Sequence, residues 1–167
     1  MKRIVATVLV LAALFAFASC NILQELKPYE AEDKVFEKAG LSLTLTEAFE
    51  ETSYEGYTVC YEALFSAVYV LKEPFSAIEG FENYTIDQYE DLVLQANASK
   101  NPTSSTLDGT PVMEYSWENT DLGVTYRYFA IMLKGEDAFW LVQFTCAQEY
   151  YEEYKPYFEK WAKTAEV

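Results

Sequence analysis

AFWLVQFTC, residues 138–146, is the stretch from which the architecture of this chain is inferred. Its only polar side chains are Gln143 and Thr145, so both faces of the extended segment are mostly apolar. A strand with one face in water alternates apolar and polar residues, whereas a strand that is apolar on both faces is covered on both. The stretch therefore predicts an inner strand of a sheet with chain packed above and below it.

Further strand-like runs lie on both sides of this stretch in the sequence. Residues 111–117 and 124–133 precede it across short turn-rich segments, which is the pattern of an antiparallel meander. Earlier in the chain, residues 41–46 alternate leucine with serine or threonine. Residues 57–62 and 66–72 are rich in β-formers and suggest a hairpin that Pro74 ends. We expect an antiparallel sheet of about six strands.

Two helices are predicted to cover this sheet. Thr85 and Gln88 have the spacing of a capping box, which predicts a helix over residues 85–98, followed by a loop over residues 99–106. Near the end of the chain an apolar stripe at helical spacing predicts a second helix. Because proline is tolerated in a first helical turn, Pro156 predicts that this helix begins near it. The stripe comprises Tyr150, Tyr154, Phe158 and Trp161. The fold class is therefore α+β.

The N-terminus has the pattern of a secretory signal. Lys2 and Arg3 precede an apolar run over residues 4–17, which is shorter than the roughly 20 residues of a spanning helix. Ala18-Ser19-Cys20 resembles the lipobox of bacterial lipoproteins, with Phe17 at the position that usually holds a branched aliphatic residue. The resemblance implies cleavage before Cys20 and a diacylglycerol on its thiol. The alternatives are ordinary secretory cleavage with an incidental cysteine, or a membrane span.

This interpretation divides the chain into three parts. Residues 1–19 are a signal peptide, residues 20–33 are the lipidated cysteine and a tether, and residues 34–167 are one domain. More than one acyl chain, for example diacylglycerol with an added palmitate, gives stable anchoring where a single chain does not. We expect a lipoprotein anchored to the cell membrane on its extracytoplasmic side.

Charge limits the possible partners. Loss of Lys2 and Arg3 with the signal peptide moves the formal charge from −15 to −17. So acidic a surface repels nucleic acid, and no nucleic-acid partner is expected. The same charge is also explained by a well-solvated outer face. Cys60 and Cys146 remain, each in a predicted strand, and outside the cytoplasm they could form a disulfide or stay as two buried thiols.

Three stretches resemble the PsbP-like family of extracytoplasmic domains and lipoproteins. They are residues 40–49 (GLSLTLTEAF), 134–140 (KGEDAFW) and 154–161 (YKPYFEKW), with Thr46 at a position where similar sequences usually have proline. The resemblance covers about residues 34–167 and implies an α/β/α sandwich around an antiparallel sheet. Because proteins of one fold serve unrelated roles, it implies no particular function.

Catalytic and metal chemistry finds no support in the sequence. The chain has no histidine, which excludes Ser-His-Asp and Cys-His sites and zinc sites built on imidazole. No two cysteines have C-x-x-C spacing, and acidic loops at residues 118–121 and 135–137 lack the ligand order of a calcium loop. We therefore expect no catalytic residue, no metal, no cofactor and no enzymatic activity.

Four residues are candidates for ligand contact. Arg127, the only arginine after Arg3, lies inside an apolar strand between two tyrosines and could clamp a carboxylate. The alternative is an ion pair, because a two-residue turn at Thr120-Asp121 would place Glu114 directly opposite Arg127. Most aromatic rings follow core periodicity, and the exceptions form a cluster near the last helix. These exceptions are Tyr150, Tyr151 and Tyr154.

Two functions remain open after this reasoning, and an enzyme, which would need a deep cleft with a carboxylate of raised pKa, is a third and disfavoured option. The first is a non-catalytic accessory or protein-interaction module, held at the membrane by Cys20, with an unknown envelope protein as partner. The alternative is a module that binds a small ligand in a pocket between the sheet and a helix.

Overall fold

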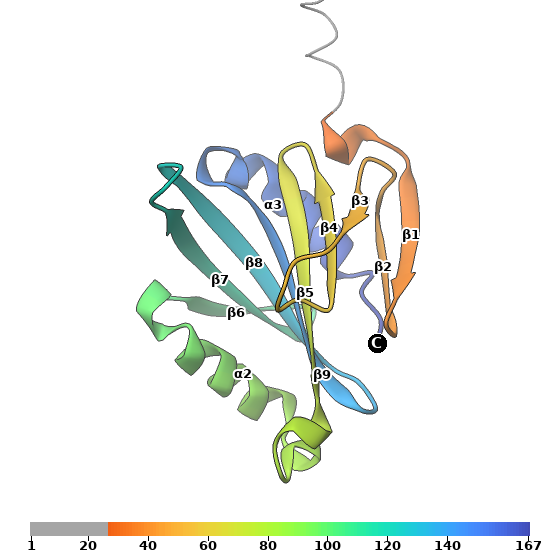
Figure 1. Cartoon of the computed structure of the whole chain (residues 1–167), viewed down its shortest axis with the longest axis vertical. Coiled ribbons are helices and arrows are strands. Elements are labelled where there is room, and N and C mark those ends of the chain that lie inside the picture. Colours follow the sequence, from red (N-terminus) through yellow and green to blue (C-terminus); the bar gives the residue numbers. More distant parts are fainter. Residues whose placement is uncertain (1–26) are drawn as a thin grey trace, which may run out of the picture.

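A seven-stranded antiparallel sheet forms the centre of the computed structural model, which describes residues 27–167 (Figure 1). The predicted signal peptide, Cys20 and the first part of the tether lie outside the described residues. The strands, in their order across the sheet, are β3 Glu50–Thr52, β4 Val59–Ala63, β5 Ser66–Pro74, β9 Ala138–Ala147, β8 Val124–Lys134, β7 Thr110–Asn119 and β6 Thr103–Leu107.

The strand β9 lies in the middle of this sheet. It pairs antiparallel with β5 on one side and with β8 on the other, and every residue from Ala138 to Cys146 is buried. The prediction of an inner strand covered on both faces is confirmed, as is the α+β fold class. The sheet has seven strands, where about six were expected.

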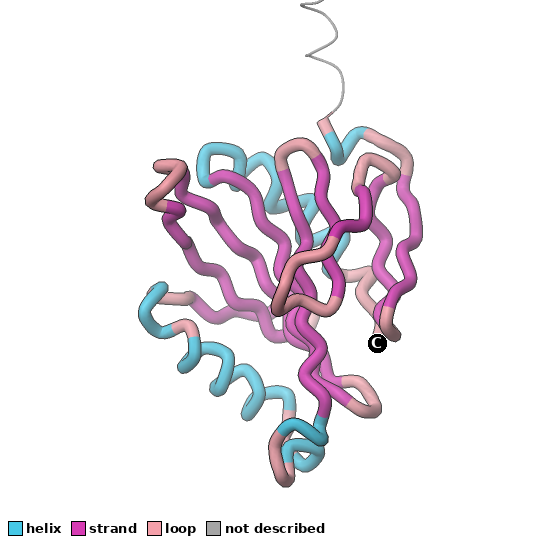
Figure 2. Tube along the Cα trace, in the orientation of Figure 1, coloured by secondary structure: helices cyan, strands magenta, loops and turns pink. Residues whose placement is uncertain are grey.

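Helices cover both faces of the sheet, which makes an α/β/α sandwich (Figure 2). On one face α3 Tyr151–Ala162 packs Phe158 and Trp161 into a core with Val142 and Phe144 of β9. On the other face α2 Ile86–Ala96 packs Tyr89 and Val93 onto side chains of β7, β8 and β9. Those side chains are Met113, Met132, Phe139 and Leu141. The predicted capping box is present, since Thr85 accepts from the backbone of Gln88 and Gln88 accepts from that of Thr85.

A separate hairpin of β1 Asp33–Lys38 and β2 Leu41–Thr46 extends the layer on the α3 face. Its leucines, predicted from their period-two pattern, are fully buried in the α3 core: Leu41, Leu43 and Leu45. The turn residues Ala39 and Gly40 both have positive φ, 56° and 98°. Two successive left-handed residues match the twist of a tight hairpin.

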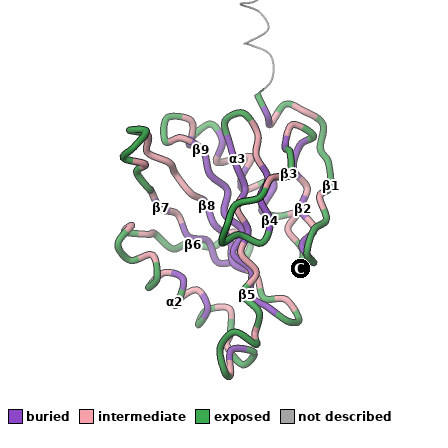
Figure 3. The backbone as a smooth tube through the Cα atoms, in the orientation of Figure 1, coloured by how far each residue is buried: buried purple, intermediate pink, exposed green. Residues whose placement is uncertain are grey.

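Three strands were not predicted: β1, β3 and β6. The loop expected over residues 99–106 is wrong for its second half, because Thr103–Leu107 forms β6. All three strands lie at sheet edges and are almost wholly exposed, as the green stretches of Figure 3 show. An exposed edge strand buries no apolar face and so leaves no period-two pattern in the sequence.

The last helix begins earlier than Pro156 predicts. A short 3₁₀ turn, Gln148–Tyr150, leads directly into α3 at Tyr151, so Pro156 lies inside the helix. Proline at this position removes the hydrogen bond to the carbonyl of Glu152. Pro156 and Glu152 are both exposed, so water can satisfy that carbonyl.

Part of the predicted tether belongs to the domain. The 3₁₀ turn η1, Pro28–Glu30, places the ring of Tyr29 parallel to that of Tyr157 on α3, with centroids 4.0 Å apart. Thr46 of β2 donates to the carbonyl of Pro28, and Lys27 pairs with Glu153. We call this contact between residues 27–30 and α3 the N-terminal latch. Residues 27–30, which were assigned to the tether, therefore pack against the domain.

Neither α2 nor α3, nor any other helix within residues 27–167, is long and apolar enough to cross a membrane.

Candidate functional site

The helix α2 covers only part of its face of the sheet (Figure 1). The rest of that face is lined by aromatic rings. Two cavities of about 370 and 330 Å³ lie there and share Tyr69, Trp117 and Tyr128 as lining residues. We call the pair the aromatic groove. Its rings are Tyr54, Tyr57, Phe65, Tyr69, Tyr115, Trp117, Tyr126 and Tyr128.

One wall of the groove is a ladder of cross-strand aromatic pairs. Tyr115 of β7 lies directly opposite Tyr128 of β8, and their rings are parallel with centroids 4.5 Å apart. The next pair on the same face, Trp117 and Tyr126, has centroids 6.2 Å apart at an interplanar angle of 25°. Such same-face pairs stabilise a sheet, and here they also leave Trp117 43% exposed.

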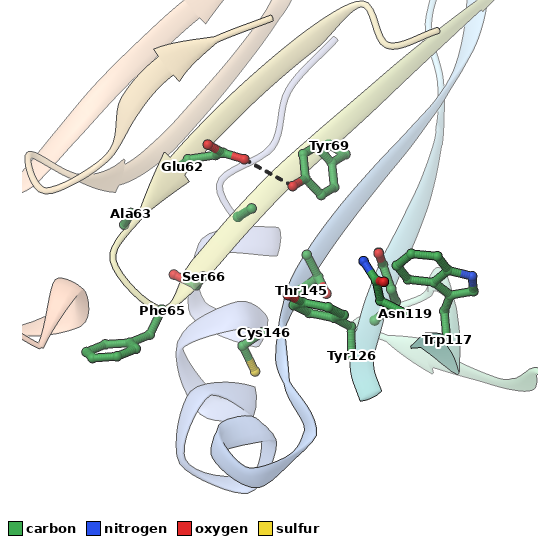
Figure 4. Close-up of a pocket in the computed structure, with 12 residues that line it drawn as sticks. Glu62, Ala63, Phe65, Ser66, Tyr69, Trp117, Asn119, Tyr126, Thr145 and Cys146 are labelled. Carbon is green, nitrogen blue, oxygen red and sulfur yellow. Dashed lines mark hydrogen bonds between the residues drawn. The ribbon is translucent and has the colours of Figure 1, made fainter. Parts of the chain in front are cut away.

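The opposite wall comes from β5 and from the connection between β3 and β4. Tyr69 of β5 packs against Tyr57 at 5.0 Å and against Tyr54 at 5.9 Å between ring centroids. Tyr54 and Tyr57 are 45% and 39% exposed. Figure 4 shows Tyr69 on one side of the first cavity, with Trp117 and Asn119 on the other.

Polar groups lie at the two ends of the groove. In the first cavity the hydroxyl of Tyr69 donates to Glu62 Oε1 at 3.1 Å (Figure 4). In the second, Lys100 Nζ lies 4.5 Å from the centre of the Tyr115 ring and donates to Asn97 Oδ1 at 2.9 Å. The groove thus carries one carboxylate and one ammonium on opposite sides of its rings.

Burial changes the proton equilibria of the groove. It raises the pKa of Tyr69, Tyr115 and Tyr128, with a further contribution at Tyr69 from the charge of Glu62. It lowers the pKa of Lys100 from its ordinary value of 10.5. The phenols are therefore protonated at neutral pH, and two of them donate within the groove, Tyr69 to Glu62 and Tyr115 to Gln143 Oε1 at 2.8 Å.

The cysteine beside the groove is not activated as a nucleophile. Cys146 borders the first cavity, but burial raises the pKa of its thiol to about 12, and a protonated thiol is a poor nucleophile. Within residues 27–167, no three His, Cys, Asp or Glu side chains come together in a way that could hold a metal ion.

The two predicted cysteine positions lie on opposite faces of the sheet. Cys60 of β4 is directly opposite Tyr69, on the α2 face, whereas Cys146 of β9 belongs to the core under α3. The strand β5 also separates β4 from β9. Both are buried free thiols, so of the two alternatives the disulfide is wrong.

Arg127 lies on the α3 face and is held by an ion-pair network. Its guanidinium is 3.6 Å from Glu114 Oε2 and 4.8 Å from the centre of the Tyr151 ring. The predicted direct pairing is wrong in register, because the connection of β7 to β8 has four residues, 120–123. Arg127 therefore lies opposite Ser116, and Glu114 reaches it diagonally. The ion-pair interpretation of Arg127 is the one that this geometry favours.

The three predicted ligand tyrosines lie near one another at the start of α3. Tyr151 and Tyr154 are each 2% exposed, and Tyr150 packs against Phe65 with ring centroids 5.3 Å apart. Tyr151 donates to Glu114, and Tyr154 lies against Tyr29. Their role in ligand contact stays a prediction, and the burial of Tyr151 and Tyr154 argues against it.

The groove residues were not singled out from the sequence. A signal was present, since Tyr115-x-Trp117 and Tyr126-x-Tyr128 place large rings on one face of two consecutive strands. Core packing explains the same spacing equally well. A core and an open site differ here only in how far α2 extends over the sheet. That extent depends on how the helix packs on the sheet in three dimensions.

Comparisons with known proteins bear on the fold. No family model matches this chain, and no curated protein matches its sequence. The solution structure of cyanobacterial PsbP (CyanoP) from Synechocystis sp. PCC 6803 is similar, with a TM-score of 0.54 at 10% identity over 82% of this chain and 93% of that chain. A crystal structure from Bacteroides thetaiotaomicron VPI-5482 has a TM-score of 0.52 at 11% identity, over 83% of this chain and 48% of that chain.

At such identities the likeness concerns the fold alone. The fold is PsbP-like, and the expectation drawn from residues 40–49, 134–140 and 154–161 is confirmed to that extent. This chain matches only about half the length of the Bacteroides protein.

Proposed function

We propose that this PsbP-like chain is a non-catalytic binding module, anchored by lipid on Cys20 to the extracytoplasmic side of the membrane, that holds a small ligand in the aromatic groove. The observation that carries the proposal is the groove itself. Three of its rings, Tyr54, Tyr57 and Trp117, are between 39% and 45% exposed. The rings of Phe81, Tyr89 and Phe139, in the cluster packed with α2, are at most 2% exposed. Concave sites lined by rings and a few polar groups are the usual form of small-molecule sites.

The proposal that a ligand occupies the groove can be tested on the protein as it is purified from its native membrane. We expect small molecules extracted from the wild-type protein to be depleted about tenfold or more from the double variant Tyr57→Ala/Trp117→Ala, because each ring contact contributes about 0.5–1.5 kcal/mol. Mass spectrometry of the extracts measures this ratio. Both side chains are well exposed, so the variant should fold. Equal content in the two proteins would remove the groove as the binding site.

The anchor gives a second prediction. Cells grown with radioactive palmitate should label the wild-type protein and leave Cys20→Ala unlabelled, and the variant should leave the membrane fraction. Since Cys60 is a buried thiol in the domain, Cys60→Ala is the matched control and should keep its label. Label that persists on Cys20→Ala, or a wild-type protein without label, would contradict the anchor.

A protein partner is a second candidate function, supported by a different surface. The β4–β5 and β7–β8 turns lie at the same end of the sheet and carry exposed apolar side chains (Figure 1). These are Leu64, Phe65 and Leu122, with exposures of 74%, 43% and 66%. The double variant Leu64→Ser/Leu122→Ser separates the two functions, because it should lose a cross-linked envelope protein while retaining the ligand of the groove.

A further inference from the structure

We propose that the ligand of the aromatic groove is an uncharged oligosaccharide; this inference rests on the groove being the binding site. The first argument is the chemical contrast between two parts of one sheet face. The cluster packed against α2 mixes tyrosines with purely apolar side chains, which include Phe81, Phe139, Met113, Met132 and Leu141. Past the end of the helix seven of the eight rings that line the groove are tyrosine or tryptophan, and the eighth is Phe65.

Such rings combine an apolar face with a polar edge. Tyrosine and tryptophan are favoured where one part of the ring is covered and another meets water or a polar partner. A pyranose ring has the complementary character, since its C–H groups form apolar faces and its hydroxyls project from the edge. A lipid chain or other fully apolar ligand would offer no hydrogen-bond partner to Tyr57 and Trp117, two of the rings that the groove leaves exposed, at a cost in free energy.

The spacing of the rings suits a ligand longer than a single sugar. The pairs Tyr115–Tyr128 and Trp117–Tyr126 follow one another along β7 and β8, and Tyr69 faces them across the groove. The two cavities, about 370 and 330 Å³, share three lining residues and are therefore adjacent. Each falls in the range of volumes typical of small-molecule sites.

Charge argues for a neutral ligand. One end of the groove holds the carboxylate of Glu62 and the other the ammonium of Lys100, so a ligand that spans both meets no net charge. A cationic ligand would meet Lys100, which already occupies the face of the Tyr115 ring at 4.5 Å. A polyanion would be repelled by a chain of formal charge −15 before removal of its signal peptide.

Tryptophan fluorescence gives a local measurement of binding. Of the three tryptophans, Trp140 and Trp161 are 2% and 0% exposed, and Trp117 is 43% exposed and lines both cavities. Acrylamide quenching should therefore report mainly on the groove. The full chain is held in micelles of a zwitterionic detergent without a sugar head group, because a maltoside would compete for the site.

The probes are uncharged tetrasaccharides of glucose, mannose, galactose, xylose and N-acetylglucosamine. We expect at least one to protect Trp117 from acrylamide in a saturable manner, and calorimetry to show about a tenfold weaker affinity for Tyr57→Ala and Tyr128→Ala. Tyr57→Ala changes an exposed ring and keeps the test valid if Tyr128→Ala does not fold. Tyr84→Ala, a partly buried tyrosine of the α2 cluster, is the control and should bind as the wild type does.

The outcomes separate this inference from the proposed function. If no tetrasaccharide binds at millimolar concentration while groove-dependent compounds are still extracted from the native protein, the saccharide class is wrong and the groove remains the site. Tighter binding of tetragalacturonate, an anionic probe, would overturn the requirement for a neutral ligand. Binding of a tetrasaccharide that Tyr57→Ala and Tyr128→Ala both leave unchanged would place the ligand elsewhere and overturn both proposals.

Discussion

Phe158→Ala is expected to lower the free energy of unfolding by about 3–5 kcal/mol. The side chain is fully buried at the centre of α3, where its ring lies 5.7 Å from that of Phe144 on β9 and 6.0 Å from that of Trp161. Alanine removes the buried ring and leaves a cavity that rigid neighbours on the sheet cannot fill. Urea unfolding followed by circular dichroism measures the change.

Phe65→Ala is the matched control for this substitution. Its ring packs against Tyr150 but is 43% exposed, so truncation should cost less than about 1 kcal/mol. A comparable loss in the two variants would mean that α3 is not the main cover of this sheet face.

Glu114→Gln is expected to destabilise the protein by about 2–3 kcal/mol at neutral pH. The carboxylate is only 14% exposed, and it accepts from Lys155 Nζ at 2.8 Å and from the hydroxyl of Tyr151 at 2.5 Å. The guanidinium of Arg127 lies 3.6 Å from Glu114 Oε2 and is the third group that stabilises the negative charge of this carboxylate. The amide removes the negative charge and leaves Lys155 and Arg127 partly buried without a counter-charge. Glu51→Gln, whose pair with Lys38 is half exposed, should cost less than about 1 kcal/mol.

Acid should reduce this difference between wild type and variant. Burial disfavours the charged form of Glu114, but the hydrogen bonds from Lys155 and Tyr151 and the charge of Arg127 outweigh it, so the pKa lies below its ordinary value of 4.5. A lowered pKa contributes stability above pH 4.5 that is lost as the pH falls through the folded-state value. Unfolding curves at pH 7 and pH 3 test this, and a constant gap between wild type and Glu114→Gln would refute a role for the charge.

The sequence predicted the structure correctly for those segments that bury apolar surface. Residues 138–146 became the central strand, and the leucines of residues 41–46 became the buried face of a hairpin, because burial requires the pattern that local reading detects. The strands β1, β3 and β6 bury almost no apolar surface. Backbone hydrogen bonds to a neighbouring strand require no particular side chains, so the sequence does not reveal them. Their existence depends on the tertiary neighbour that each one pairs with.

Two further differences arise from geometry that residue types do not encode. Because the connection between β7 and β8 has four residues and not two, Ser116 lies opposite Arg127 where Glu114 was expected. The side chains of Arg127 and Glu114 are long enough to form the ion pair diagonally. The groove depends on where α2 ends relative to the strands below it. Rings such as Tyr128 and Tyr69 have the same spacing whether a helix covers them or a ligand does, so the sequence alone could not distinguish a site from a core.

The N-terminal latch sets how far the domain can travel from its proposed anchor. The contacts of Lys27 and Tyr29 with α3 fix residue 27 on the domain. Even fully extended, the chain from Cys20 to that point spans at most about 25 Å. A groove held within that distance of the membrane has a much higher concentration near the membrane surface than it would have if it were spread through the whole compartment. A weak affinity for a ligand on that surface would therefore suffice for nearly full occupancy. Lengthening the tether would dilute the groove without changing any contact inside it.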